Sequence, residues 1–171
     1  MSFEDAVRQL NQWKRQGILR DYVLFGAVAA TAYMEPVFTE DLDVIILVDT
    51  DAEYLSTFRK VAQLSQGQEG MHYLIGGVPV QMFPTTTQPL YRDTLETAQQ
   101  TRIGDVRVRV PSREHLILLY LQAFRAKDHF RILQILEHAD VTKLNALLER
   151  FDDEAKTLAA RLQSLRRAGL S

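Results

Sequence analysis

The sequence contains no cysteine and a single tryptophan among its 171 residues. Without cysteine the chain has no disulfide bond and no thiolate metal site. No apolar run approaches the roughly 18 residues that a membrane-spanning helix requires. The charged N-terminal segment "MSFEDAVRQLNQWKRQG" lacks the apolar stretch of a signal peptide. These absences predict a cytoplasmic protein that does not enter a membrane.

An excess of charge of one sign is also missing. The 20 Lys and Arg residues nearly balance the 22 Asp and Glu residues, which gives a formal net charge of −2. This balance excludes bulk electrostatic attraction to nucleic acid or to an anionic membrane, although a local basic patch remains open. The sequence shows no DNA-reading motif. Its length suits one domain, or a compact domain with a helical extension.

The chain changes its pattern at Ser112. Before this residue, apolar periodicity and turn residues predict helices over 3–16, 27–34, 52–66 and 91–100, strands over 21–26, 42–48 and 104–110, and a hairpin over 72–83 about Gly76 and Gly77. After Ser112 the helical periodicity continues and predicts three or four helices. The sequence therefore predicts an α+β fold, with a mixed β-sheet and helices over residues 1–111 and a C-terminal helical segment over 112–171 packed on them.

The stretch "FTEDLDVIILVD" (38–49) places two carboxylates at the start of an apolar strand. Asp41 and Asp43 are two residues apart, so on a strand they project to the same face, roughly 7 Å from each other. Two like charges this close raise each other's pKa unless a cation lies between them, and Mg²⁺ prefers such oxygen ligands. The alternative is that Asp41 caps a turn and Asp43 is an exposed charge at the strand end.

A second feature lies upstream, where Gly26 and Ala27 join a short strand to the next helix. A turn of small residues lets the backbone approach a phosphate, and a helix N-terminus favours anions. The order of strand, small-residue turn, helix and D-x-D strand resembles the polymerase-β-type nucleotidyltransferase superfamily. The likeness is greatest to small bacterial members related to abortive-infection toxins and minimal nucleotidyltransferases. "TEDLDV" (39–44) matches their T-x-D-[IL]-D-V stretch, and "RAKD" (125–128) matches their R-x-K-D element.

The resemblance implies a nucleotidyltransferase fold that binds a nucleoside triphosphate together with Mg²⁺ or Mn²⁺. It implies that Asp41 and Asp43 hold the metal and serve catalysis. The residues that it places around the nucleotide are Gly26, Ala27, Thr39, Lys127 and Asp128. The implied reaction transfers a nucleoside monophosphate to a hydroxyl group of a protein, an RNA or a small molecule.

The third catalytic position departs from the family pattern. The family's third carboxylate, which binds the metal and activates the attacking hydroxyl, corresponds to Gln81 in "VPVQMFP". Glutamine is neutral, cannot act as a general base and is a weaker ligand for Mg²⁺. Asp49 and Asp51 follow the D-x-D strand at its other end, while Glu69 or Asp105 would have to approach in space to replace the missing carboxylate.

Two functions are consistent with this combination. The first is an active nucleotidyltransferase in which Gln81 lines the site without acting as a base. The second is a catalytically lapsed binding or regulatory module of the toxin–antitoxin type, which would contact a partner protein or a second copy through its cleft or its helices. A third interpretation places solvated carboxylates on an unrelated α+β fold.

The remaining polar residues indicate no competing chemistry. The four histidines, which lack H-x-x-x-H or H-E-x-x-H spacing and are expected at the surface or in hydrogen bonds, are His72, His115, His129 and His138. Ser112 is expected to cap a helix, and no G-x-S-x-G motif surrounds any serine.

Overall fold

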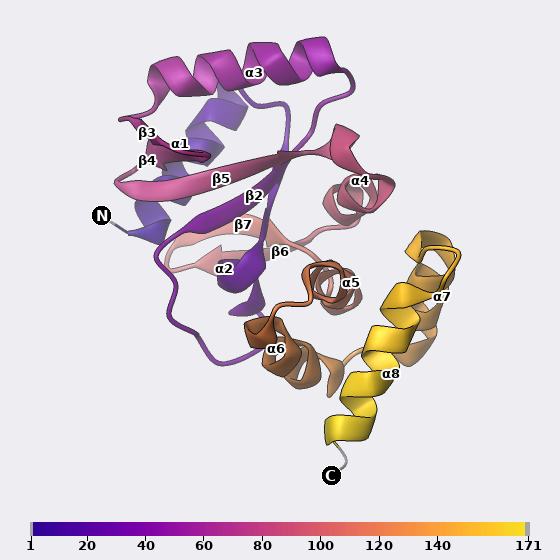
Figure 1. Ribbon diagram of the computed structural model, residues 1–171. Helices are drawn as coiled ribbons and strands as arrows, with labels where there is room; N and C mark the ends of the chain where they lie inside the picture. Colours follow the sequence, from indigo (N-terminus) through magenta and orange to yellow (C-terminus); the bar gives the residue numbers. More distant parts are fainter. Residues whose placement is uncertain (1, 170–171) are drawn as a thin grey trace.

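The structure, a computed structural model, describes residues 2–169 and combines a mixed sheet with helices (Figure 1). Its elements are, in chain order, α1 (Phe3–Arg15), β1 (Tyr22–Phe25), α2 (Gly26–Ala30), β2 (Leu42–Ile46), α3 (Asp51–Leu64), β3 (Gln68–Glu69), β4 (His72–Ile75), β5 (Val78–Pro84), the 3-10 helix η1 (Thr85–Thr87), α4 (Pro89–Glu96), β6 (Gln99–Ile103), β7 (Val106–Val110), α5 (Arg113–Ala123), α6 (Ala126–Leu136), α7 (Val141–Phe151) and α8 (Thr157–Gly169). Within residues 2–169 no helix is long and apolar enough to cross a membrane.

The main sheet has five strands in the order β1-β2-β5-β4-β3. Only β2 and β5 run parallel, and the other neighbours are antiparallel. Strands β6 and β7 form a separate antiparallel pair. This mixed sheet with its helices confirms the predicted α+β class.

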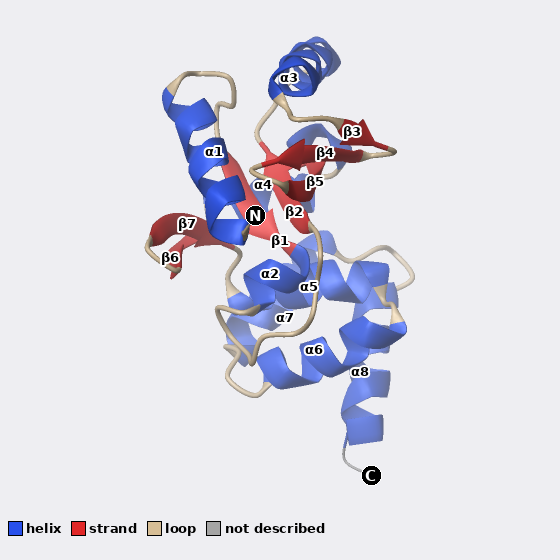
Figure 2. Ribbon diagram, turned by 90° about the vertical axis from the view of Figure 1, so that its left-hand side faces the viewer, coloured by secondary structure: helices blue, strands red, loops and turns tan. Residues whose placement is uncertain are grey.

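The two faces of the main sheet differ in what covers them. Along β5, Val78, Val80 and Met82 are buried, while the alternating Pro79, Gln81 and Phe83 are half-buried. Helices α1 and α3 pack on the buried face (Figure 2): the Phe58 ring lies 5.9 Å from that of Tyr73, and a side chain at Gly76 would meet the backbone of Ala6. The opposite face of β5 and β4 is therefore left free to line a cleft.

The four helices after Ser112 confirm the expected helical segment. Helix α5 is its centre, because every residue from Glu114 to Leu121 is buried. The Ser112 side chain caps this helix by accepting a hydrogen bond from the His115 backbone N–H. One continuous apolar core joins α5–α8 to the sheet. The helices therefore do not have a separate core of their own.

One predicted helix was partly wrong. Residues 91–96 are helical, but Gln99–Ile103 form β6, which pairs with β7. Thr101 and Ile103 face Val108 and Val106 across that pair, so an alternating pattern of partly buried side chains is satisfied by a strand. The predicted single strand over 104–110 is thus the second arm of a hairpin.

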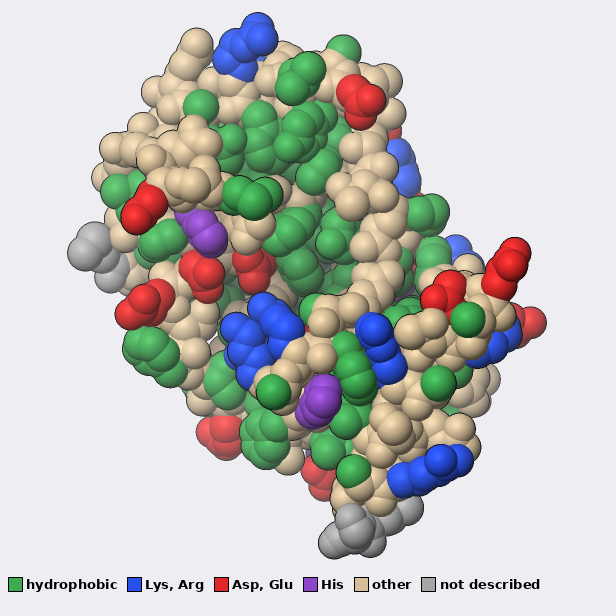
Figure 3. Space-filling model, in the orientation of Figure 1, with side chains coloured by type: hydrophobic (Ala, Val, Ile, Leu, Met, Phe, Trp, Pro, Cys, Tyr) green, Lys and Arg blue, Asp and Glu red, His purple; other side chains and the backbone are tan. Residues whose placement is uncertain are grey.

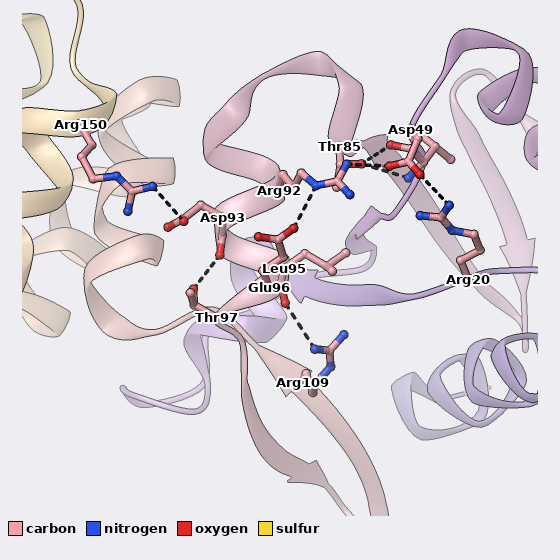
Figure 4. Close-up of polar contacts among 11 residues, drawn as sticks. Arg20, Asp49, Thr85, Arg92, Asp93, Leu95, Glu96, Thr97, Arg109 and Arg150 are labelled. Atoms are coloured by element: carbon pink, nitrogen blue, oxygen red, sulfur yellow. Dashed lines mark hydrogen bonds and ion pairs between the residues drawn. The ribbon is translucent and has the colours of Figure 1, made fainter.

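Helix α4 connects the segment just after the C-terminal end of β2, at Asp49, to the helical segment (Figure 4). Its Arg92 donates to Asp49 at 2.7 Å, and Arg20 donates to the same carboxylate at 2.8 Å. The next residue, Asp93, accepts a hydrogen bond from Arg150 of α7 at 3.2 Å. Asp49 is therefore held in ion pairs beyond the end of β2 and does not line the cleft.

Candidate active site

A cleft of about 920 Å³ opens between the free face of the sheet and the segment from α5 to α6. It is lined by Phe25, Gly26, Ala27, Phe38, Thr39, Glu40, Asp41, Asp43, Glu69, His72, Pro79, Gln81, Phe83, Gln88, Tyr91, Leu119, Tyr120, Gln122, Ala123, Arg125, Lys127 and Arg131. Figure 3 shows acidic and histidine side chains on one bank of this hollow and basic side chains on the opposite bank. Most of the site residues expected from the sequence therefore lie together.

Strand pairing brings four cleft residues into one row across the sheet. Phe25 pairs with Asp43, Asp43 with Gln81, and Gln81 with His72. Paired residues on neighbouring strands project to the same face. Glu69 extends the row, because it pairs with His72 on the edge strand β3. Asp43, Gln81 and His72 consequently face the cleft side by side.

Asp41 is held from two sides just before β2 begins. The Thr39 hydroxyl donates to Asp41 Oδ1 at 3.0 Å and also lies 3.3 Å from the Asp41 carbonyl oxygen. On the other side His72 Nε2 lies 3.4 Å from Asp41 Oδ2. Thr39 therefore orients the carboxylate towards the cleft and, at the same time, shapes the turn that leads into the strand.

Asp43 is the most perturbed carboxylate of the cleft. Burial, reinforced by the charge of Asp41, raises the pKa of Asp43 from 3.8 to about 6, although Arg125, His72 and Lys127 oppose the rise. No residue within 2–169 donates a hydrogen bond to its side chain. A half-buried carboxylate without a donor is costly to ionise unless a cation lies beside it.

Gly26 forms the wall against which Asp43 packs. Its backbone has φ of +70°, and a Cβ atom added there would collide with Asp43 Oδ2. The carbonyl oxygen of Gly26 accepts a hydrogen bond of 2.7 Å from the Tyr120 hydroxyl of α5. Glycine is therefore required at this position both by its conformation and by the space that the carboxylate occupies.

The opposite bank of the cleft is basic. Arg125, Lys127 and Arg131 line it from the start of α6. Asp128 is fully buried and does not line the cleft. Its carboxylate instead accepts hydrogen bonds from Arg125 at 2.9 and 3.1 Å and from Arg131 at 3.3 Å. Of the two residues on this bank that were expected around the nucleotide, Lys127 is exposed and lines the cleft, whereas Asp128 positions the arginines.

The residues present fit a magnesium ion that is bound largely through water and phosphate. Within residues 2–169 no set of three or more His, Cys, Asp or Glu side chains is placed to bind a metal. Mg²⁺ commonly uses only one or two protein carboxylates and keeps several waters and substrate phosphates. Asp41 and Asp43 supply that pair. The lack of donors to Asp43 is consistent with a cation at this place.

Several cleft residues were missed by the sequence reasoning. His72 was expected to be an ordinary polar residue, yet it contacts Asp41 and pairs with Gln81. The two-residue turn at Gly76 and Gly77 contained the signal, because it fixes the register that pairs 75 with 78 and hence 72 with 81. Of the two carboxylates considered as substitutes for the third one, Glu69 lines the cleft and Asp105 does not.

Comparison with known proteins gives structural likeness without sequence likeness. No model of a known protein family matches the chain, and no curated protein sequence does. Among solved structures, an antigenic nucleotidyltransferase-like protein from Paracoccidioides brasiliensis is 18% identical, with 94% of each chain covered and a TM-score of 0.58. ANT(2")-Ia in complex with adenylyl-2"-tobramycin is 12% identical, with 92% of this chain and 95% of that chain covered and a TM-score of 0.53.

A solution structure of the antibiotic-resistance factor ANT(2'')-Ia gives a similar result, with 13% identity, coverage of 96% of this chain and 92% of that chain, and a TM-score of 0.50. These identities establish shared architecture alone. Because the matches cover 92 to 96% of the chain, they extend over both the sheet and the C-terminal helices. The interpretation of an unrelated α+β fold is thereby wrong, and the chain has the nucleotidyltransferase fold.

Proposed function

We propose that the chain binds a nucleoside triphosphate with Mg²⁺ or Mn²⁺ in this cleft and transfers the nucleoside monophosphate to a hydroxyl group. The observation that supports this most is Asp43. It is a half-buried carboxylate without a hydrogen-bond donor, on the same face as Asp41 and pressed against Gly26. Two carboxylates kept this close are stabilised by a cation, and a metal–triphosphate supplies one.

The cleft residues expected from the sequence would have distinct roles in binding. Asp41 and Asp43 would hold the metal, which neutralises phosphate charge when bound. The backbone at Gly26 and Ala27 would approach the phosphates. Lys127 would contact the triphosphate from the opposite bank, because its ammonium group has no ion pair within residues 2–169. Thr39 would keep Asp41 in place through its hydrogen bond of 3.0 Å.

The transfer step requires a proton to leave the acceptor. The acceptor oxygen would form a bond to the α-phosphorus, and the bond between that phosphorus and the leaving pyrophosphate would break. Gln81 lies beside Asp43 in the strand register, where an amide cannot take the proton, so the proton would pass to solvent water. The cleft therefore supports binding of the donor more strongly than rapid transfer. The adenylyl-2"-tobramycin in the ANT(2")-Ia complex shows a nucleotidyl product in a similar fold.

Gln81 is also the observation that favours a second function. A chain that binds the nucleotide but does not transfer it would serve as a binding or regulatory module, for example in a toxin–antitoxin pair. In that function the same cleft would report nucleotide occupancy to a partner protein or a second copy. The acceptor, whether protein, RNA or small molecule, would then have no role.

One assay separates the two functions. The protein is incubated with each labelled triphosphate and Mg²⁺ or Mn²⁺, and wild type is compared with Asp43→Ala and Gln81→Asp. The active nucleotidyltransferase is supported if the wild type transfers label and Asp43→Ala does not. Transfer only by Gln81→Asp supports the lapsed module.

Binding is measured separately by thermal shift, because a ligand specific to the native state raises the melting temperature. Mg–triphosphate is expected to stabilise wild type and the Asp51→Ala control, whose exposed carboxylate lies outside the cleft. It is not expected to stabilise Asp43→Ala. Absence of stabilisation of wild type at millimolar Mg–triphosphate would refute both functions.

A further inference from the structure

The cleft has two chemically different ends. Strands β2 and β5 run parallel, so the direction from Asp41 to Asp43 on one strand matches that from Pro79 to Phe83 on the other. The first end, up to and including the row of paired residues Phe25, Asp43, Gln81 and His72, holds the four carboxylates and the histidine of the cleft, which are Glu40, Asp41, Asp43, Glu69 and His72. Beyond Asp43 and Gln81, in the direction of Phe83, the lining contains no carboxylate.

Three aromatic rings form a wall that begins with Phe25, which pairs with Asp43, and continues beyond that row with Phe83 and Tyr91. Phe25 and Phe83 meet edge to face with ring centres 4.9 Å apart, and Tyr91 of α4 lies 6.1 and 6.2 Å from them. All three are half-buried and line the cleft, unlike the fully buried side chains on the other face of the sheet. Such rings offer a planar ligand faces and edges for stacking.

Two amides complete this end. Gln88 and Gln122 are joined by reciprocal hydrogen bonds of 3.0 and 2.7 Å, and both line the cleft. Arg161 of α8 donates to the backbone carbonyl oxygen of Gln122 at 3.0 Å, which fixes the end of α5. Burial raises the pKa of the Tyr91 hydroxyl, so the phenol stays protonated and can donate. The wall thus combines ring faces with neutral donors and acceptors.

The distribution of charge determines which ligands suit this wall. A polycation would need free carboxylates here. The carboxylate beside the wall is Asp43, which pairs with Phe25, and in the proposed function this carboxylate holds the metal. The bank across the cleft carries Arg125, Lys127 and Arg131, which repel cationic groups. An uncharged planar ring needs neither a carboxylate nor a basic side chain as a partner. It gains stacking and hydrogen bonds from the aromatic–amide wall.

We infer that the wall made by Phe25, Phe83, Tyr91, Gln88 and Gln122 binds a planar, uncharged ring with hydrogen-bonding groups on its edge, and that it rejects polycationic aminoglycosides. This inference rests on the proposed function, since the ring enters a cleft whose other end receives the triphosphate. Two sources supply the same chemistry. One is the base of the nucleotide donor, and the other is an aromatic or nucleoside acceptor.

The experiment compares probes with and without a ring by isothermal titration calorimetry. The probes are Mg–tripolyphosphate, the four Mg–nucleoside triphosphates, adenosine, 4-hydroxybenzyl alcohol and tobramycin. The last three are titrated in the presence of saturating Mg–tripolyphosphate, or alone if tripolyphosphate does not bind. The variants are Tyr91→Leu and Phe83→Leu, and the matched control is Tyr54→Leu, which removes a half-buried tyrosine from α3 on the other side of the sheet.

Each source gives its own expected pattern. If the base occupies the wall, at least one nucleoside triphosphate binds tenfold or more tightly than tripolyphosphate, and Tyr91→Leu removes the difference. If an acceptor occupies it, Tyr91→Leu leaves triphosphate binding unchanged but weakens adenosine or 4-hydroxybenzyl alcohol at least tenfold. Phe83→Leu is expected to act in the same direction, and Tyr54→Leu to stay within twofold of wild type.

Failure of this inference differs from failure of the proposed function. The inference is overturned if ring-bearing and ring-free probes bind equally, if the wall variants behave like Tyr54→Leu, or if tobramycin binds in a manner that Tyr91→Leu abolishes. If tripolyphosphate or a nucleoside triphosphate still binds in these cases, the proposed function stands. If no triphosphate binds but a ring does so through Tyr91, the proposed function alone fails. Binding of no probe at all overturns both.

Discussion

At the scale of single residues, the contact between Gly26 and Asp43 decides whether the cleft can form. Gly26→Ala is expected to lower the free energy of unfolding by about 3 kcal/mol, since it adds the strain of a positive φ to a collision with the carboxylate. It is also expected to abolish stabilisation by Mg–triphosphate, because Asp43 must move. Urea unfolding and thermal shift measure the two effects.

Gly17→Ala is the matched control for this substitution. Gly17 has φ of +78°, but an added Cβ would meet nothing within 4 Å. Its cost is therefore the conformational strain alone, about 1 kcal/mol, and ligand stabilisation should be preserved. Equal losses in the two variants would show that the contact with Asp43 is unimportant.

Asp43 gives a prediction about pH. Its pKa is raised from 3.8 to about 6, so between these values the unfolded chain loses the proton first and the contribution of Asp43 to stability falls as pH rises. Asp43→Asn removes this penalty. The variant should match wild type near pH 4 and exceed it by about 2 to 3 kcal/mol at pH 7, from about 1.4 kcal/mol per pKa unit.

The comparison is made by chemical denaturation from pH 4 to pH 8 without divalent ions. Asp105→Asn, at an exposed turn of the β6–β7 hairpin, is the control and should leave the pH profile unchanged. A difference between wild type and Asp43→Asn that stays constant with pH would contradict a raised pKa. Adding Mg²⁺ at pH 7 should stabilise wild type and not the variant.

Sequence reasoning identified the residues whose roles depend on near neighbours. Asp41, Asp43 and Gly26 could be found because D-x-D spacing and a glycine before a helix are local patterns. Tyr91 could not, since its position beside Phe25 results from packing between α4 and the sheet. Asp128 was expected to contact the nucleotide, and its complete burial between two arginines results from tertiary contacts that spacing does not encode.

At the scale of elements, two neighbouring residues at the start of α6 have different roles: Lys127 would bind phosphate, and Asp128 holds the arginines of the basic bank in place. Lys127→Ala is expected to weaken Mg–tripolyphosphate five- to tenfold, about 1 kcal/mol, without a change in melting temperature, because the side chain is exposed and makes no ion pair within residues 2–169. Lys60→Ala on α3 is the control and should change neither quantity. Calorimetry and thermal unfolding provide the two readouts.

Asp128→Asn, unlike Lys127→Ala, should lower the melting temperature. It leaves Arg125 and Arg131 without their buried carboxylate, which is expected to cost about 3 kcal/mol of stability. Phosphate affinity should fall as well, since Arg125 loses its orientation. An unchanged melting temperature would mean that Asp128 does not organise the basic bank.

The β6–β7 hairpin shows why one element was misassigned. "YRDTLETAQQ" has helix formers up to Glu96, and nothing in its composition marks the change to a strand. The strand β6 exists because β7 offers it a pairing edge and apolar partners. Tertiary context of this kind overrides weak local preference. The helices after Ser112 were predictable because the apolar residues of α6 and α7 recur at helical spacing and because Ser112 and Asp140 cap α5 and α7.

At the scale of the whole molecule, the continuous core predicts one cooperative transition. Helix α4 joins the sheet to the helical segment through Arg92 and Asp93, and His115 of α5 adds a contact of 2.7 Å to Asp93. The fluorescence of Trp13 in α1 and the far-ultraviolet circular dichroism, which reports mainly on the helices, should therefore give the same urea midpoint.

Leu162→Ala tests this coupling from the far end of the chain. Leu162 is a buried residue of α8, and its truncation should cost about 3 kcal/mol. Both probes should shift together, although Trp13 lies on the opposite side of the sheet. If the urea midpoint reported by Trp13 fluorescence stayed at its wild-type value, the boundary near residue 111 would separate two independently stable units.

The hydrogen bond from Tyr120 to the Gly26 carbonyl oxygen has a consequence for motion. It joins the two banks at the base of the cleft, so a hinge that swung the helices away from the sheet would have to break it. The cleft would then open through movement of the shorter segments at its entrance. The main one is the loop over residues 31–41 between α2 and β2, in which Phe38 is 87% exposed. We expect ligand exchange to follow the rate at which this loop moves, with the two banks held at a fixed separation.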